Sequence, residues 1–89
     1  YLEPCEPNPA RTEVRFSFTI KQPSHVRLVI YNAAGQRIRE LMSGYMTPGR
    51  HTYVWDGTDA RGNRVAGGVY FYRLESGKVT QTRKLIWLR

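Results

Sequence analysis

The side chains that could carry out chemistry in this sequence are few, and their spacing does not form a reaction centre. His51 and Asp56 could belong to a catalytic triad only beside an activated serine, and no Gly-x-Ser-x-Gly nucleophile motif occurs. The sequence also lacks a His or Cys cluster with metal-ligand spacing and a phosphate-binding glycine loop. We therefore predict no catalytic residue and no cofactor, and we predict that the chain is not an enzyme.

A polar stretch containing Asp56, Asp59 and Asn63 is the best candidate for a cation site. Calcium loops place oxygen ligands at alternate positions, followed by a glycine and a terminal glutamate. Here the spacing is three and four residues, and Arg61 and Arg64 bring positive charge. Short polar side chains of this kind cap their own backbone in turns. The sequence therefore predicts a structured turn and no metal site.

The formal net charge is +7, from 14 Lys and Arg against 7 Asp and Glu. This balance permits binding to nucleic acid, anionic glycolipid or a membrane surface. No run of four or more basic residues occurs, which favours arginine spread over solvent-facing surfaces. We predict no binding to nucleic acid. The single cysteine excludes an internal disulfide, so the core must depend on the Tyr, Phe and Trp side chains.

The chain is long enough for one domain, and its first ten residues differ from the rest. Pro4, Pro7 and Pro9 exclude a helix there, so residues 1–10 are predicted to be the end of an extended Pro-rich linker. The chain starts without Met and without a signal peptide, and it has no apolar run that could span a bilayer. We expect it to be a module of a longer protein, with the domain at residues 11–89.

Alternation of apolar and polar residues predicts strands along the whole domain. From Thr12 onward, Val14, Phe16, Phe18 and Ile20 share one face, which is typical of a half-buried antiparallel strand. Turn residues separate the strands at regular intervals. The sequence predicts an all-β, immunoglobulin-like antiparallel β-sandwich of about six or seven strands, with a barrel as the alternative. The main predicted strands are Thr12–Ile20, His25–Asn32, Gln36–Leu41, Arg50–Trp55, Gly68–Glu75 and Val79–Leu88.

Two of these strands have patterns that predict their place in a sheet. The second is apolar on both faces, because Val29 and Tyr31 alternate with its core residues, so we expect it to be central or partly covered on both sides. The third, Gln36–Leu41, is short and charged, as strands at a sheet edge are. Ser43–Pro48 is predicted to be a loop. In the fourth, we expect the face that carries Trp55 to point inward.

The sequence resembles a known family through motifs that span most of its length. It is similar to the immunoglobulin-like C-terminal domains of the flagellar hook-capping protein and to the C-terminal sorting domains of the type IX secretion system. The resemblance implies a sorting and anchoring domain at residues 11–89 of a larger secreted protein. The matching residues are Asn8-Pro9, Val26–Gln36, Pro48–Gly62, Gly68–Leu74 and Lys84-Leu85.

In such sorting domains the outer-membrane translocation machinery recognises the last strand and the Gly-Val-Tyr strand. A surface sortase then cleaves before the domain and joins the upstream cargo to anionic lipopolysaccharide. The resemblance thus implies a secreted or cell-surface location and cleavage at or before the Pro-rich segment. The alternative is that Leu85–Leu88 completes the core, and the two roles can coexist. The implied recognition residues are Gly68, Tyr70, Lys84, Leu85, Ile86, Trp87, Leu88 and Arg89.

Two other functions remain open from the sequence. Exposed aromatic rings could stack on sugars, as in the accessory carbohydrate-binding module of a glycoside hydrolase; the candidates are Tyr31, Tyr45 and Trp87. The chain could instead be a structural domain of a flagellar hook cap.

Overall fold

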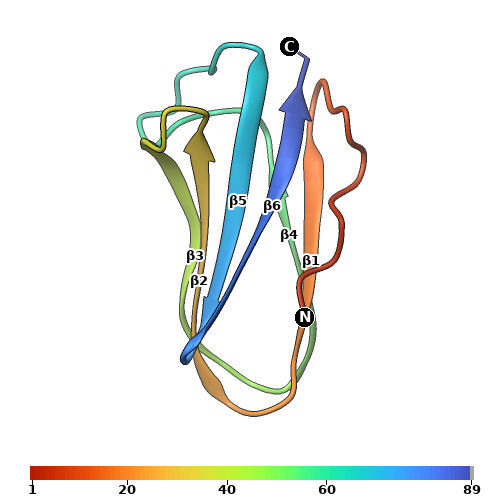
Figure 1. Cartoon of the computed structure of the whole chain (residues 1–89), viewed down its shortest axis with the longest axis vertical. Helices are drawn as coiled ribbons and strands as arrows, with labels where there is room; N and C mark the ends of the chain where they lie inside the picture. Colours follow the sequence, from red (N-terminus) through yellow and green to blue (C-terminus); the bar gives the residue numbers. More distant parts are fainter. Residues whose placement is uncertain (89) are drawn as a thin grey trace.

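Six strands form two facing sheets in the computed structural model, which describes residues 1–88 (Figure 1). One sheet has the order β3-β2-β5-β6, the other pairs β1 with β4, and every strand pair is antiparallel. This confirms the predicted all-β, immunoglobulin-like sandwich. The strands are β1 (Val14–Ile20), β2 (Ser24–Asn32), β3 (Arg37–Met46), β4 (Gly49–Trp55), β5 (Gly68–Ser76) and β6 (Val79–Trp87).

Aromatic side chains join the two sheets across the core. The rings of Phe16 on β1 and Tyr72 on β5 have centroids 4.5 Å apart. Those of Trp55 on β4 and Trp87 on β6 lie 5.0 Å apart. All four side chains are at most 1% exposed, so each removes a large apolar area from water. The core of this small domain is therefore built on ring contacts between the sheets.

The central position predicted for β2 is confirmed, because this strand pairs with β3 on one side and β5 on the other. The predicted end of β3 was wrong, since the strand continues past Leu41 to Met46 and includes most of the predicted loop. Two register shifts against β2 break the alternation of side chains in this pairing. An edge strand with broken periodicity and a glycine inside it has the sequence pattern of a loop.

Residues 1–10 form isolated bridges and a bend at residues 7–9, and they pack against the sandwich. Figure 1 shows this segment running beside β1 toward the end of β6. Glu6 and Arg15 form an antiparallel bridge, and Ala10 forms a parallel bridge with Trp87. Leu2, Cys5 and Ala10 belong to the buried core cluster. The segment predicted as a linker end thus closes the gap between β1 and β6.

A buried hydroxyl fastens this segment to the core. The Tyr72 hydroxyl accepts a hydrogen bond from the Cys5 backbone N–H at 2.9 Å and donates one to the Glu3 carbonyl oxygen at 3.1 Å. The Cys5 side chain lies beside it and is 5% exposed. Burial raises the pKa of the Cys5 thiol above its ordinary value, because the thiolate would lose hydration there.

We expect this burial to make stability fall in alkaline solution. The unfolded thiol loses its proton near pH 8.5, while the folded thiol, with its raised pKa, keeps it to higher pH. Its stabilising contribution is therefore complete below about pH 8.5 and is lost as the pH rises toward the folded pKa. Urea unfolding from pH 7 to 10 measures this, with Cys5→Ala as the control that should flatten the first part of the decline. Equal slopes for the two proteins would contradict the expectation.

Candidate functional site

The antiparallel pairing of β5 with β6 brings the predicted recognition residues together. Gly68 pairs with Trp87, and Tyr70 pairs with Leu85. Residues that are 19 and 15 positions apart in the sequence therefore lie side by side, because a tight hairpin joins β5 and β6. Arg89 lies outside the described residues.

Some of the predicted recognition residues belong to the core. Tyr70, Leu85 and Trp87 are 6%, 0% and 1% exposed, respectively. Tyr70 also donates its hydroxyl hydrogen to the Ala66 carbonyl oxygen. A partner that meets the folded domain cannot contact these three side chains. They can hold the strand in place, and this fits the alternative role of completing the core.

The opposite face of the same two strands is open to solvent. Val69 lies opposite Ile86, and Phe71 lies opposite Lys84. Val69 and Leu88 are 37% and 45% exposed, Lys84 is exposed, and Phe71 and Ile86 are half-buried. We call these five residues the outer strip. Sequence reasoning missed Val69 and Phe71, although the alternation within β5 already placed them on the face opposite Tyr70.

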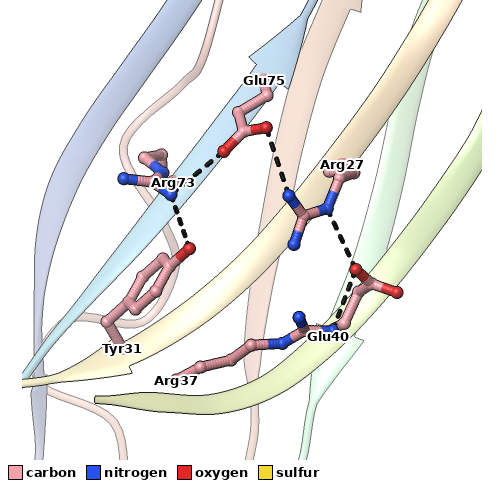
Figure 2. Close-up of polar contacts among 6 residues, drawn as sticks. All are labelled: Arg27, Tyr31, Arg37, Glu40, Arg73 and Glu75. Atoms are coloured by element: carbon pink, nitrogen blue, oxygen red, sulfur yellow. Dashed lines mark hydrogen bonds and ion pairs between the residues drawn. The ribbon is translucent and has the colours of Figure 1, made fainter. Parts of the chain in front are cut away.

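The rest of this sheet face is covered by charged side chains (Figure 2). They shield Val29, which is fully buried on the face of β2 that lies outside the core cluster. The second apolar face of β2 is thus covered by a ladder of ion pairs. Its contacts are Arg27 with Glu40 at 3.0 Å and Glu75 at 3.4 Å, Arg37 with Glu40 at 3.1 Å, Arg73 with Glu75 at 3.1 Å, and Arg73 with the Tyr31 hydroxyl at 2.7 Å.

The charges of this ladder are largely paired with one another. Its arginines are already paired with carboxylates, so little free positive charge is left on β2 and β5 for a polyanion. Exposed ion pairs of this type contribute about 0–1 kcal/mol each to stability. The outer strip beside it contains no acidic residue and exposes apolar carbon. The two halves of the face therefore differ in chemistry.

The polar stretch after β4 forms the turn that the sequence predicted. One carboxylate oxygen of Asp59 accepts hydrogen bonds from the backbone N–H groups of Arg61 at 2.9 Å and Asn63 at 3.0 Å. Asp56 accepts a hydrogen bond from the Thr58 N–H at 3.2 Å. Its hydrogen bonds with Thr58 lower the pKa of Asp56. Among residues 1–88, no group of three or more His, Cys, Asp or Glu could hold a metal ion.

His51 and two of the three candidate sugar-binding rings lie at least partly exposed. The His51 ring lies 5.7 Å from the ring of Phe18, and its Nε2–H donates to the Thr47 carbonyl oxygen at 2.8 Å. Tyr45 is 65% exposed, whereas Tyr31 is half-buried below the Arg73 guanidinium. Trp87 is buried and cannot stack on a sugar, so of the three candidates only the two tyrosines remain.

Residues 8–79 match the family described as the FlgD Ig-like domain. The chain belongs to this family. The FlgD Ig-like domains are a structural, non-catalytic family. The match includes β5 but ends before most of β6.

Three solved structures show the same fold. Dimeric latent PorU from Porphyromonas gingivalis aligns with a TM-score of 0.76 at 21% identity, covering 96% of this chain and 9% of PorU. FlgD from P. aeruginosa aligns with a TM-score of 0.64 at 22% identity, over 83% of this chain and 57% of that one. FlgD from Xanthomonas campestris, described in connection with hook capping, aligns with a TM-score of 0.65 at 26% identity, over 89% and 58%.

The chain thus spans less than two thirds of each of these proteins. No curated protein matches its sequence. Within residues 1–88, no helix has the length and apolar character needed to cross a membrane.

Proposed function

We propose that this FlgD-type Ig-like domain is the non-catalytic C-terminal sorting domain of a larger exported protein. In this proposal the outer-membrane translocation machinery of the type IX secretion system recognises the outer strip. A surface sortase then cleaves at or before residues 1–10, and the upstream cargo is joined to anionic lipopolysaccharide on the cell surface. The observation that carries the proposal is the exposed apolar face of β5 and β6, the two strands that the family resemblance implicates.

The geometry of the strip suits recognition by a protein. Ile86 and Leu88 alternate with the buried Leu85 and Trp87, so the core fixes the positions of the exposed side chains. Contiguous apolar residues on an otherwise polar surface mark contact sites, because covering them removes apolar area from water. Lys84 adds a positive charge next to this apolar surface. A partner with an apolar groove and a nearby carboxylate would match both features.

PorU is a type IX secretion protein, so the similarity in fold to latent PorU, which extends over 96% of the chain, supports the proposal. The second candidate is a structural role in a hook cap, which the family match and the two FlgD structures favour. The two functions predict different results for a cargo fused upstream of this domain. Only a sorting domain carries such a cargo across the outer membrane.

The experiment is an export assay in a bacterium with a type IX secretion system, using a reporter fused before Tyr1. A variant with Val69→Ser, Ile86→Ser and Leu88→Ser removes apolar contacts from the strip and leaves the core unchanged. We expect export to fall at least about tenfold, since every 1.4 kcal/mol of lost binding energy is a factor of ten in affinity.

The matched control replaces exposed valines elsewhere, with Val54→Ser on β4 and Val79→Ser at the start of β6. These side chains are 49% and 62% exposed, so the chemical change is similar. We expect the control to be exported like the unmodified fusion, and circular dichroism should show the same folded signal for both variants. Equal export of the strip variant and the control would reject the outer strip as the recognition surface. No export of the unmodified fusion would reject the sorting function.

A further inference from the structure

Residues 1–10 fill the gap between β1 and β6, which we call the slot, and form backbone hydrogen bonds on both sides of it. On the β1 side, the Thr19 N–H donates to the Tyr1 carbonyl oxygen at 2.9 Å, and the Arg15 N–H donates to that of Glu6 at 2.7 Å. On the β6 side, the Leu88 N–H donates to the Ala10 carbonyl oxygen at 2.8 Å. The segment therefore pairs with one sheet and then with the other.

Asn8 imitates a strand residue at the edge of β6. Its side-chain oxygen accepts a hydrogen bond from the Ile86 N–H at 3.0 Å, and its side-chain nitrogen donates to the Lys84 carbonyl oxygen at 3.2 Å. Ala10 continues this pattern by donating its N–H to the Ile86 carbonyl oxygen at 2.9 Å. The edge of the last strand is thus already occupied between Lys84 and Leu88.

The segment is nevertheless paired less regularly than the six strands. It contacts its neighbours through isolated bridges, because Pro4, Pro7 and Pro9 have no N–H to donate. Its connection to the domain, residues 11–13, is exposed and lies outside the strands. Local opening is easier where a ladder is interrupted than where it is continuous, so we expect this segment to open before any of the six strands.

An empty slot would be unstable and selective. It would leave the edge groups of β1 and β6 without partners and open three core positions, those of Leu2, Cys5 and Ala10. Only an extended chain with small or apolar side chains at these positions can repair both losses. The one sequence that the structure shows to fit is residues 1–10.

We propose that residues 1–10 are an exchangeable strand, and that the slot takes the same segment from a second copy of this chain. A segment from a second copy makes the same bonds, so exchange costs little except at residues 11–13, where the chain must cross to the other copy. The segment of the same chain normally wins because its effective concentration is high. This inference concerns self-association and stands independently of the proposed export function.

The first test adds a fluorescent peptide with the sequence of residues 1–10 to the whole chain, under reducing conditions. In the Asn8→Ala chain the built-in segment loses two side-chain hydrogen bonds, each typically a factor of about five in equilibrium. We therefore expect the peptide to bind the Asn8→Ala chain at least about tenfold more tightly than the unmodified chain. The amide NMR signals of Ile86 and Leu88 should shift on binding.

The matched control is Asn32→Ala, which removes side-chain hydrogen bonds of the same kind in the β2–β3 turn, far from the slot in sequence. It should bind the peptide no better than the unmodified chain does. A peptide that itself carries Asn8→Ala should bind the Asn8→Ala chain more weakly than the native peptide does. Equal binding by the two chain variants, or no binding by either, would overturn the proposal.

The second test shortens the connection by deleting Thr12, so that the segment no longer reaches its own slot without strain. We expect this variant to form dimers in sedimentation experiments, because strained hinges favour exchange. In the dimer the Cys5 thiol should stay as protected from alkylation as in the unmodified chain, because the slot is filled. If the variant stays a monomer, whether its Cys5 thiol is protected or exposed, the segment does not exchange.

Discussion

Replacing Gly57 with alanine is expected to destabilise the domain by about 3–5 kcal/mol, since the change combines backbone strain with overpacking. Gly57 has a φ of +81°, a conformation in which a side chain is strained. A Cβ added there would lie only 2.0 Å from Cζ2 of the Trp87 ring. The Trp87 ring is buried between the sheets, so it cannot move away without displacing other core side chains. This loss would be a large part of the stability of a small domain, typically 5–15 kcal/mol.

Gly62→Ala provides the matched control for this change. Gly62 has nearly the same φ, +87°, but an added Cβ would meet no atom within 4 Å. Only the backbone strain remains, and we expect a cost of about 1–2 kcal/mol. Urea unfolding of the two variants measures the difference, which isolates the contact with Trp87. Equal losses would show that the Trp87 ring does not limit the space at Gly57.

The contact between Gly57 and Trp87 illustrates what the sequence could not predict. The sequence predicts a turn in the polar stretch that contains Asp56, Asp59 and Asn63, because short polar residues favour turn conformations. The sequence does not show that this turn lies against the last strand, 30 residues away. Local patterns report φ preferences and the faces of strands, whereas such a contact depends on how the two sheets stack. The presence of six strands was therefore predictable from local patterns, whereas the end of β3 and the packing of the connections were not.

Residues 1–10 show the same limit at the edge of the sandwich. Three prolines exclude a helix there, but proline content does not reveal which edge of the sandwich such a segment lies on. The burial of Leu2 and Cys5 depends on the open gap between β1 and β6. For the candidate site, alternation along β6 could separate Ile86 and Leu88 from Leu85 and Trp87. Alternation along β5 likewise separates Val69 and Phe71 from Tyr70, but that they lie opposite Ile86 and Lys84 depends on the register of β5 against β6.

The last strand has both core and surface residues, and Trp87→Ala is expected to affect the core strongly. The Trp87 side chain is 1% exposed and contacts Trp55, so its removal leaves a large cavity and should cost about 3–5 kcal/mol. Its ring N–H is buried and has no hydrogen-bond partner among the described residues. Losing this unpaired group offsets part of the cost, which places the expected value toward the lower end of that range. Guanidinium unfolding of the purified variant measures it.

Leu88→Ala, one residue further on, is the control, because its side chain is 45% exposed and should change stability by less than about 0.5 kcal/mol. A similar loss in both variants would contradict the assignment of Trp87 to the core and Leu88 to the surface. Trp87→Phe then separates packing from recognition, since it keeps an aromatic ring in the core and removes the unpaired N–H. If the translocation machinery recognises the folded strip, a fusion carrying Trp87→Phe should be exported normally. Loss of its export with the fold intact would mean that the machinery recognises the last strand before it joins the sheet, when the indole is still accessible.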